Sequence, residues 1–455
     1  MTLPTLPSQG STTWFDWAQG LDAAVRAGGG NTVVHGDDAN VARPSTTAAV
    51  VWFGSVEPTN ADDTLDVWVP VSEDGTGGAT SGLTAEEIAV DPTVRAAYAT
   101  AAPLATATGV YDRTRNLYNL KPAHLRRFRG RLAAAEAGTA ECRIAVLGTS
   151  IAAGQGVTDK ATQNWPNAFR QILTAEGIPA TTGPVMTNLG DSGTDPRWSF
   201  TGGTWTKFTP GGGFTDRTAL YQSSSATAVA TYTSTTPGTV AEVWYSNGSG
   251  AFTVAIDGGT AVTVTPAGGT SIARYQVTGL SNAVHTITIT RTAGTLYLAA
   301  ACVRAANAVS VGTFGSGGAT VNNFQQASQP YDLRAFAISW APHLATVGFM
   351  TNDANQSVTP ETYGLRLQSF VTALVTAGVD ILLIAEPPAN GLDLAPFRTV
   401  LYQIADTNDL PVLDLFDRWG TYTSANSLGL MFDGFHPAAP GYRDYGRAVR
   451  RALIP

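Results

Sequence analysis

Three residues that together could carry out acyl transfer occur in sequence settings that suit the reaction. Ser150 lies in a glycine-rich turn, GTSIAAG, which directly follows the apolar run RIAVLG. His436 and Asp433 lie close together near the C-terminus, in the run DGFHP. A serine hydroxyl is a poor nucleophile until a base removes its proton, and an imidazole held by a carboxylate can be that base. We therefore predict that Ser150 is a nucleophile, that His436 is its general base, and that Asp433 orients the imidazole.

The same chemistry requires fixed hydrogen-bond donors for the oxyanion that forms on the attacked carbonyl. Candidates are the backbone N–H of Ser150, a glycine N–H in the run FGSGGAT, and the side-chain amide of Asn352 in the run MTND. We favour Gly318 as the glycine, because its run follows a predicted strand and leads into a predicted helix. Gly193, in the run LGDSGT, is the alternative. Ser192 in that run is not predicted to be a nucleophile, because no strand and helix frame it.

The elements that must position these residues have the pattern of a parallel α/β sheet. Short apolar strands are predicted in the runs RIAVLG, NAVSVGTFG, LATVGFM, VDILLIAEPP and LPVLDLF. Amphipathic stretches such as ETYGLRLQSFVTALVTAG lie between them. Continuous apolar strands that alternate with amphipathic helices are typical of a parallel sheet covered on both faces. In such sheets ligands bind at the carboxyl ends of the strands, which is where the candidate residues lie.

Residues 196–303 interrupt this pattern. The runs TAVATYT, TVAEVWYS, AFTVAIDG, TAVTVTP, ARYQVTGL and HTITITRT are rich in β-branched and aromatic residues, and several alternate with period two. This pattern predicts an all-β sandwich, jelly-roll-like, inserted into the α/β domain. Its aromatic residues Trp244, Tyr245 and Tyr275 either pack in the core, which we favour, or form a platform for sugar rings.

The rest of the chain is divided by composition. Residues 1–70 are predicted to form a small module of short strands. Residues 71–142 are predicted to be a linker followed by helical segments. The last of these is a helix over residues 111–138, which Pro122 is expected to split. The predicted α/β domain comprises residues 143–195 together with 304–455.

Composition excludes several classes of protein. The chain has 455 residues, of which 44% are hydrophobic and 14% charged, as expected for a globular protein. A net charge of −8 without a long basic run argues against nucleic-acid binding. No run is apolar and long enough to span a membrane, and the first residues lack a signal-peptide pattern, so we expect a soluble chain. The two cysteines, Cys142 and Cys302, fit no zinc site and are predicted to be buried.

Taken in order, the four runs resemble the four sequence blocks of the SGNH or GDSL hydrolase superfamily. VLGTSIAAGQG is similar to the serine block, FGSGGAT to the glycine block, MTND to the asparagine block and DGFHP to the histidine block. The resemblance implies a three-layer α/β/α sandwich with a short parallel sheet, and hydrolysis of esters, often acetyl esters on carbohydrates or lipids. It implies no metal or organic cofactor. The signature roles fall on Ser150, Gly318, Asn352 and His436, with Asp433 as the triad acid.

Two positions depart from the family pattern. Thr149 stands where the family has an aspartate before the nucleophile, and Met350 stands where it has a glycine two residues before the asparagine. We expect the first change to be tolerated, because that aspartate transfers no proton. We expect Met350 to crowd the strand end and narrow the pocket. Asp353 is expected to hold its loop, and His343 to be structural.

Three segments nearer the N-terminus resemble minor tail proteins of actinobacteriophages, in which an SGNH domain with a β-sandwich insert can follow. They are SQGSTTWFDWAQGLDAAV, WFGSVEPTNADDTLDVWV and LTAEEIAVDPTVRAAYATA. The resemblance implies a virion protein that contacts other tail proteins and hydrolyses esters on host-surface glycans or lipids. The alternative is a non-catalytic tail or adhesin protein that uses the hydrolase domain and the sandwich as a glycan-binding scaffold.

Overall fold

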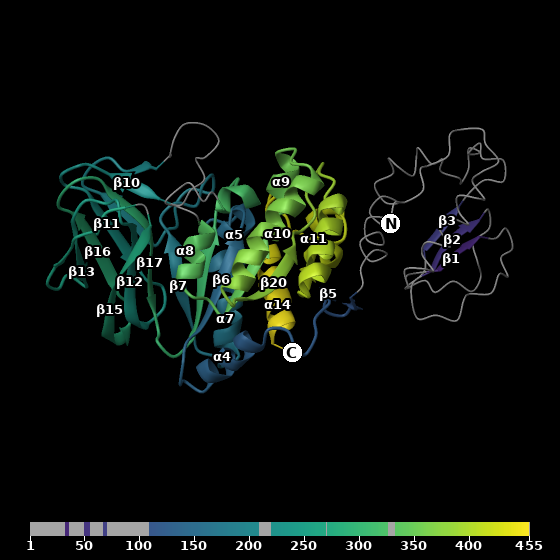
Figure 1. The fold of residues 1–455 in the computed structure, drawn as a ribbon, viewed down its shortest axis with the longest axis horizontal. Helices are drawn as coiled ribbons and strands as arrows, with labels where there is room; N and C mark the ends of the chain where they lie inside the picture. The colour runs from purple at the N-terminus through teal and green to yellow at the C-terminus, as the bar shows by residue number, and fades with distance from the viewer. Residues whose placement is uncertain are drawn as a thin grey trace. The chain divides into compact units, whose positions relative to one another are not determined.

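The computed structural model describes residues 109–208, 220–269, 271–325 and 333–454, together with three short strands nearer the N-terminus (Figure 1). The chain divides into two compact units, Met1–Thr108 and Gly109–Pro455.

The first unit contains a small parallel sheet in the order β1-β2-β3. Its strands are β1 (Thr32–His35), β2 (Val50–Gly54) and β3 (Val67–Pro70). They fall within the predicted module of residues 1–70. The rest of that module and residues 71–108 of the predicted linker and helical segment lie outside the described residues.

The second unit is built around one long mixed sheet, with the strand order β15-β12-β17-β7-β18-β6-β19-β20-β21-β5-β4. Its centre is parallel and consists of β7 (Ala180–Met186), β18 (Val309–Gly315), β6 (Cys142–Gly148), β19 (Leu344–Gly348), β20 (Asp380–Ala385) and β21 (Val412–Asp414). The register pairs Gly148 with both Gly315 and Gly348. Three neighbouring strands therefore end level with one another at the carboxyl edge of the sheet.

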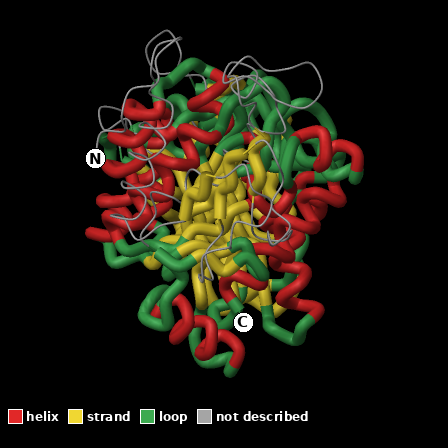
Figure 2. Tube along the Cα trace, turned by 90° about the vertical axis from the view of Figure 1, so that its right-hand side faces the viewer, coloured by secondary structure: helices red, strands yellow, loops and turns green. Residues whose placement is uncertain are grey.

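Helices cover both faces of this parallel centre, as predicted, and Figure 2 shows strands in the middle with helices on either side. The helices of the described residues are α4 (Arg126–Glu136), α5 (Ser150–Ala153), α6 (Lys160–Gln163), α7 (Trp165–Ala175), the 3₁₀ helix η1 (Val321–Phe324), α8 (Leu333–Ser339), α9 (Thr351–Asn355), α10 (Pro360–Thr376), α11 (Ala395–Asn408), α12 (Leu415–Trp419), α13 (Tyr422–Ser427) and α14 (Ala439–Leu453). None of these is long and apolar enough to cross a membrane.

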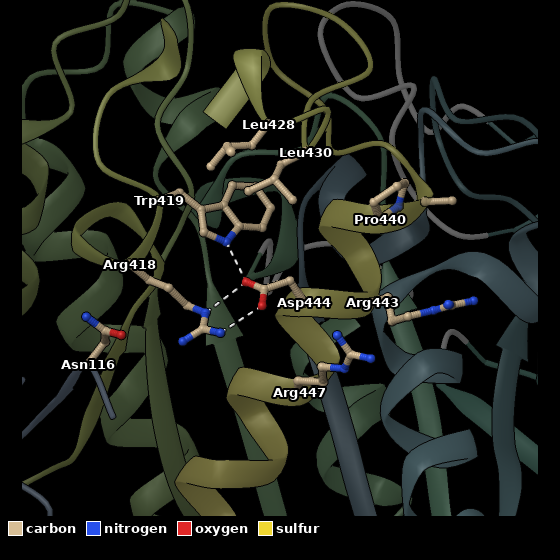
Figure 3. Close-up of a pocket in the computed structure, with 10 residues that line it drawn as sticks. Asn116, Arg418, Trp419, Leu428, Leu430, Pro440, Arg443, Asp444 and Arg447 are labelled. Carbon is tan, nitrogen blue, oxygen red and sulfur yellow. Dashed lines mark hydrogen bonds and ion pairs between the residues drawn. The ribbon is translucent and has the colours of Figure 1, made fainter. Parts of the chain in front are cut away.

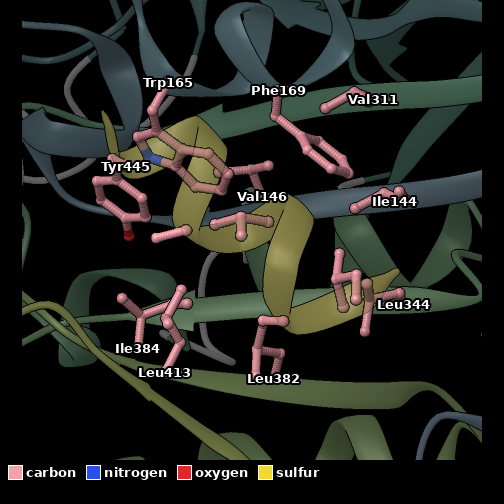
Figure 4. Close-up of a cluster of buried hydrophobic side chains, with 14 of the residues drawn as sticks. Ile144, Val146, Trp165, Phe169, Val311, Leu344, Leu382, Ile384, Leu413 and Tyr445 are labelled. Atoms are coloured by element: carbon pink, nitrogen blue, oxygen red, sulfur yellow. The ribbon is translucent and has the colours of Figure 1, made fainter. Parts of the chain in front are cut away.

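One face is covered by α4, α7 and α14, whose apolar side chains pack on Ile144 and Val146 of β6 (Figure 4). The rings of Trp165 and Tyr445 stack with their centroids 4.5 Å apart, which joins α7 to α14. Gly446 allows this close approach, because a Cβ there would lie 2.9 Å from the backbone N of Phe169. Such burial of apolar surface provides most of the free energy that holds the helices to the sheet.

The β-rich region forms two layers, and one of them continues the main sheet. β14 (Val262–Val264), β13 (Phe252–Ile256), β16 (Thr286–Arg291), β11 (Val229–Thr233) and β8 (Trp198–Thr201) form a separate antiparallel sheet in that order. β15 (Ile272–Ala283), β12 (Gly238–Ser246) and β17 (Leu296–Arg304) extend the long sheet, because β17 pairs with β7. Buried side chains of both layers form one core.

Of the three aromatic residues considered from the sequence, two pack in the core, as favoured above. Trp244 and Tyr245 are buried. The ring of Trp244 lies 4.9 Å from that of Phe336 on α8, and the ring of Tyr245 lies 5.0 Å from that of Phe252. Both residues therefore pack in cores, whereas Tyr275 is half-buried.

The predicted helix over residues 111–138 is only partly helical. It begins with a hairpin of β4 (Tyr111–Asp112) and β5 (Leu117–Tyr118), and β5 pairs with β21 at the edge of the long sheet. Asp112 accepts a hydrogen bond from the backbone N of Thr114, and Asn116 has a φ of 54°, so local turn chemistry opposes a helix here. The helix α4 begins after Pro122. Cys142 and Cys302 are both buried, as predicted, and they form no disulfide with each other.

Gly315, at the end of β18, tests how closely this strand end packs against α5. A Cβ at Gly315 would lie 2.6 Å from the carbonyl carbon of Ala152 in α5, and closer still to the next backbone N. Because backbone atoms cannot move aside, we expect Gly315→Ala to lower the free energy of unfolding by about 1–3 kcal/mol, measured by urea denaturation. The control is Gly130→Ala on the exposed side of α4, where a Cβ meets nothing within 4 Å. For Gly130→Ala we expect the free energy of unfolding to rise by about 0.5–1 kcal/mol, because alanine favours a helix over glycine. Equal stabilities of the two variants would contradict the prediction.

Candidate active site

Ser150 is the first residue of α5, directly past the end of β6. Thr149 caps the helix, and its side chain accepts a hydrogen bond from the backbone N of Ile151. Gly154, with a φ of 82°, ends the helix after one turn. The turn is tight enough that Ser150 is only 4% exposed. This strand–turn–helix arrangement places a serine hydroxyl at the carboxyl edge of the sheet.

The structure brings the three predicted triad residues together. Oγ of Ser150 lies 2.9 Å from Nε2 of His436, across 286 positions of the chain. Nδ1 of His436 lies 3.0 Å from Oδ1 and 2.9 Å from Oδ2 of Asp433. A carboxylate on Nδ1 favours the tautomer with its proton there, which leaves Nε2 as an acceptor for the serine hydroxyl. The geometry is therefore that of an activated nucleophile.

The acid of this set is held as a carboxylate. Burial raises the pKa of Asp433, but hydrogen bonds from the His436 ring and from the backbone N–H groups of Phe435 and His436 outweigh it and lower the pKa below its usual range. The two backbone bonds measure 2.8 and 2.7 Å. The turn that carries both residues thus also keeps Asp433 ionised, so that it can stabilise an imidazolium.

The loop that carries Asp433 and His436 is fastened to the serine turn. Gly156 packs directly on it, since a Cβ there would lie 2.7 Å from the carbonyl oxygen of Pro437 and 3.2 Å from Cβ of His436. The hydroxyl of Tyr442 on α14 donates to the carbonyl of Gln155 at 2.6 Å. These contacts explain how a C-terminal histidine keeps its position relative to a serine near residue 150.

The two candidate glycines of the oxyanion site differ in the state of their N–H groups. The turns that contain them are neighbours, because Gly190 and Gly317 form a parallel β-bridge. The N–H of Gly193 donates to the carbonyl of Gly190 at 3.1 Å. The N–H of Gly318 has no acceptor among the described residues, and neither has that of Ser150. Gly318 is therefore the glycine that has a donor to offer.

Asn352 lies in the first turn of α9, and its side-chain amide donates to the carbonyl of Ala319 at 3.0 Å. An amide group has two N–H donors, so one can tie the asparagine turn to the glycine turn while the other stays available. The side chain of Gln356, which follows α9, donates to the carbonyl of Gly318 at 2.8 Å. This bond orients the peptide group between Gly318 and Ala319.

Sequence reasoning missed one buried carboxylate at this edge. Glu386 follows β20 and is 2% exposed. Its Oε1 accepts from the hydroxyl of Thr149 at 2.9 Å. Its Oε2 accepts from the backbone N–H groups of Met350 and Thr351 at 2.8 and 2.7 Å. A glutamate at the end of an otherwise apolar strand, in the run LLIAEPP, was the available signal, because charged residues are rarely buried without partners.

Three other sequence-based expectations can be compared with the structure. Met350 is buried, so its side chain packs inside the protein instead of narrowing an open pocket. Ser192, which was not predicted to be a nucleophile, donates its hydroxyl to Oε1 of Gln155 at 2.9 Å. His343 accepts from the backbone N of Arg143 at 2.9 Å, and burial lowers the pKa of His343 to about 4, which suits a structural residue.

Asp353 holds the start of η1, as expected, through a 3.0 Å bond from the backbone N of Val321 to its Oδ2. Its other oxygen has no hydrogen-bond partner in the described part of the chain. Burial raises the pKa of Asp353 to about 7, and the nearby charge of Glu386 adds to this effect. The residue therefore carries a proton over part of the neutral range.

A hollow of about 690 Å³ lies beside α14 and is lined by Arg443, Arg447, Trp419 and Leu428, among others (Figure 3). The carboxylate of Asp444 on its wall pairs with Arg418 at 2.7 Å. No triad residue lines this hollow. In the described ranges no group of three or more His, Cys, Asp or Glu side chains is arranged to hold a metal ion.

The raised pKa of Asp353 predicts a pH dependence of stability. Between its ordinary pKa of 3.8 and about 7 the folded protein keeps a proton that the unfolded chain releases, so stability falls as the pH rises through this window. Asp353→Asn removes that titration and can still accept the bond from Val321. We expect the melting temperature of the variant, relative to wild type, to be higher at about pH 8 than at about pH 5. Equal pH slopes for the two proteins would refute the assignment.

Residues 281–443 match the model of the GDSL-like Lipase/Acylhydrolase family. The matched range covers about a third of the chain and contains Gly318, Asn352, Asp433 and His436, whereas Ser150 lies before it. Comparison with curated proteins gives no match.

Among solved structures, a structure described as "Peptidoglycan O-acetylesterase in action, 5 min" aligns with a TM-score of 0.58 and 16% identity, over 72% of this chain and 95% of that one. It shares the fold. A family two carbohydrate esterase from Cellvibrio japonicus aligns over 60% of this chain and 98% of that one, with 14% identity and a TM-score of 0.26. A lipase/acylhydrolase from Enterococcus faecalis aligns over 32% and 76%, with 20% identity and a TM-score of 0.27. The last two values are too low to bear on the fold.

The family match, the shared fold and the site geometry agree with one another. The chain carries a GDSL-like lipase/acylhydrolase domain and is a carboxylic ester hydrolase.

Proposed function

We propose that this protein is a serine esterase in which Ser150 forms the acyl-enzyme, His436 transfers the proton and Asp433 orients and stabilises the imidazole. The proposal rests on two contacts of the His436 imidazole. Its Nε2 lies 2.9 Å from Oγ of Ser150, and its Nδ1 lies 2.9 Å from Oδ2 of Asp433. Nucleophile, base and orienting acid within hydrogen-bond reach are the signature of nucleophilic catalysis.

The reaction follows from this arrangement in two halves. Oγ of Ser150 attacks the acyl carbonyl carbon while Nε2 of His436 takes the hydroxyl proton. The alcohol leaves with that proton, and the acyl group stays on Ser150. Water then attacks the acyl carbon and gives a proton to His436, after which the carboxylic acid leaves and Ser150 regains its proton. In each half the oxyanion is held by the N–H groups of Ser150 and Gly318 and the amide of Asn352, each worth about 3–4 kcal/mol of barrier.

For the substrate we propose acyl esters, above all O-acetyl esters, on cell-surface glycans. The peptidoglycan O-acetylesterase that shares the fold supports this substrate class by analogy. Phe432 directly precedes Asp433, and its backbone N donates to the carbonyl of His436 at 2.8 Å. Its side chain is 65% exposed and offers an apolar surface in this loop. Esters of envelope lipids are the other substrates that the family resemblance implies.

We also propose that the β-rich region contributes to sugar binding, through aromatic residues other than those considered from the sequence. Trp244 and Tyr245 are buried, but Phe200, Trp205 and Tyr221 are partly exposed. The ring of Phe200 lies 5.1 Å from that of Trp205 and 4.7 Å from that of Tyr221. Aromatic faces of this kind suit the apolar faces of sugar rings.

This aromatic cluster is connected to the site. Lys207 of β9 (Thr206–Lys207) donates to the carbonyl of Gly190 at 2.8 Å. Tyr221 begins β10 (Tyr221–Ser223), which pairs with β9. Because Gly190 bridges to Gly317 in the glycine turn, a glycan bound at the cluster would lie near the reacting carbonyl.

Location in a phage tail, with other tail proteins as partners, remains a proposal that rests on the resemblance of the N-terminal segments to minor tail proteins. The non-catalytic alternative, a glycan-binding scaffold, is supported by the two departures at Thr149 and Met350 and opposed by the intact triad geometry.

Esterase activity is tested with p-nitrophenyl acetate and a fluorophosphonate probe. We expect Ser150→Ala to lower kcat by roughly 10³-fold or more, because the nucleophile is lost. The probe should label the wild-type protein at Ser150, and His436→Ala should abolish this labelling, since the serine then lacks its base. A wild-type protein that neither turns over the ester nor reacts with the probe would favour the scaffold alternative.

The sugar-binding proposal is tested with O-acetylated peptidoglycan and p-nitrophenyl acetate in parallel. We expect Trp205→Ala to raise KM for the glycan by about tenfold, at roughly 1–2 kcal/mol for a lost stacking contact, while the small ester is hydrolysed as before. Tyr275→Ala, on β15 at the end of the long sheet, is the control and should leave KM for both substrates unchanged. A glycan KM unchanged by Trp205→Ala would remove this cluster from the binding site.

A further inference from the structure

The carboxylate of Glu386 connects the two turns that carry the reacting groups. One oxygen binds the side chain of Thr149, the residue before the nucleophile, at 2.9 Å. The other binds the backbone N–H groups of Met350 and Thr351, at 2.8 and 2.7 Å, at the start of the helix that carries Asn352. We propose that Glu386 is a positioning residue that holds the serine turn and the asparagine turn in the relative placement that catalysis needs. This inference rests on the proposed roles of Ser150 and Asn352.

The environment of Glu386 allows a single arrangement. The side chain is 2% exposed, and a buried carboxylate is tolerated only where donors surround it. All three of its described partners donate: one hydroxyl and two N–H groups that no residue of α9 could satisfy, because they lie at the helix start. Since Thr149 must donate its proton to Glu386, the lone pairs of its hydroxyl face the helix, where Ile151 donates to it. The position of Ser150 between these residues is fixed as a result.

The same contact explains why threonine stands before the nucleophile in this chain. An aspartate at position 149 would face Glu386 within hydrogen-bond distance, and two like charges in a buried site repel each other. A hydroxyl is a donor and fits. The threonine at position 149 is therefore matched by the carboxylate of Glu386, which follows the neighbouring strand β20. We expect an aspartate at position 149 to be tolerated only when Glu386 is replaced as well.

The exchange of hydrogen-bond partners gives the test. We expect Thr149→Val, which keeps the shape but loses the donor, to lower kcat for p-nitrophenyl acetate on the order of tenfold with KM within about twofold. Thr149→Ser, which keeps the hydroxyl, should restore activity close to that of wild type. Thr149→Asp should lower kcat further, because it adds a second buried carboxylate.

The double variant Thr149→Asp/Glu386→Gln separates positioning from general stability. In it the glutamine amide can donate to the new carboxylate while its oxygen still accepts from Met350 and Thr351. We expect kcat to recover at least about tenfold over Thr149→Asp alone. The second-order rate constant for labelling by the fluorophosphonate probe should rank the variants in the same way, because labelling reports the reactivity of Ser150 without the need for turnover.

Asp380→Asn is the matched control for a merely structural effect. Asp380 begins the same strand and accepts from the backbone N of Phe128 at 2.8 Å, at the opposite edge of the sheet. It should lower the melting temperature and leave kcat unchanged. Wild-type kcat in Thr149→Val, or a double variant no more active than Thr149→Asp, would overturn the inference. Ser150→Ala distinguishes this from failure of the proposed function: activity that survives Ser150→Ala removes the nucleophile assignment itself.

Discussion

The contact between the imidazole of His436 and the hydroxyl of Ser150 is the interaction on which the proposed function of this protein depends. It joins the first strand–turn–helix unit of the α/β domain to the last loop before the C-terminal helix. Neither segment could hold the contact alone, because each is a short turn. The packing of Gly156 against Pro437 and the bond from Tyr442 to Gln155 tie the turns together. The stacked rings of Trp165 and Tyr445 join α7 to α14, the helix that follows the DGFHP run.

The carboxyl edge of the sheet concentrates buried acids as well as the triad. Near the proposed reacting groups, Glu386 accepts two backbone N–H groups and Asp353 accepts one, each from a neighbouring turn. The turns that follow β18 and β19 contain such N–H groups without partners in the sheet, and carboxylates that follow β19 and β20 accept from them. The proposed oxyanion donors thus depend for their placement on these two carboxylates, in agreement with the general need for support behind a preorganised site.

The sequence predicted the parallel centre of the sheet and its helices well, because continuous apolar strands and amphipathic helices have distinct periodicities. It did not predict that β17 would pair with β7, so that the β-rich region and the parallel sheet share one sheet. Strand pairing between distant segments is not encoded in local periodicity, and an antiparallel strand can add to either edge with similar local patterns. The short hairpin of residues 111–118 was missed because turn chemistry at Asp112 and Asn116 outweighs the helical composition.

What the sequence determined by itself was the chemistry: a serine in a strand-to-helix turn, an acid and a histidine in one short run, and glycine and asparagine runs between them. These are local patterns, and the Asp433–His436 contact lies within one turn of chain, so sequence order alone could define it. The tertiary structure alone decided which candidate glycine has an N–H without an acceptor among the described residues, where the aromatic residues are exposed, and that Glu386 links Thr149 to the asparagine turn. These properties depend on distances between segments far apart in the chain, which only packing of the folded sheet and its helices sets.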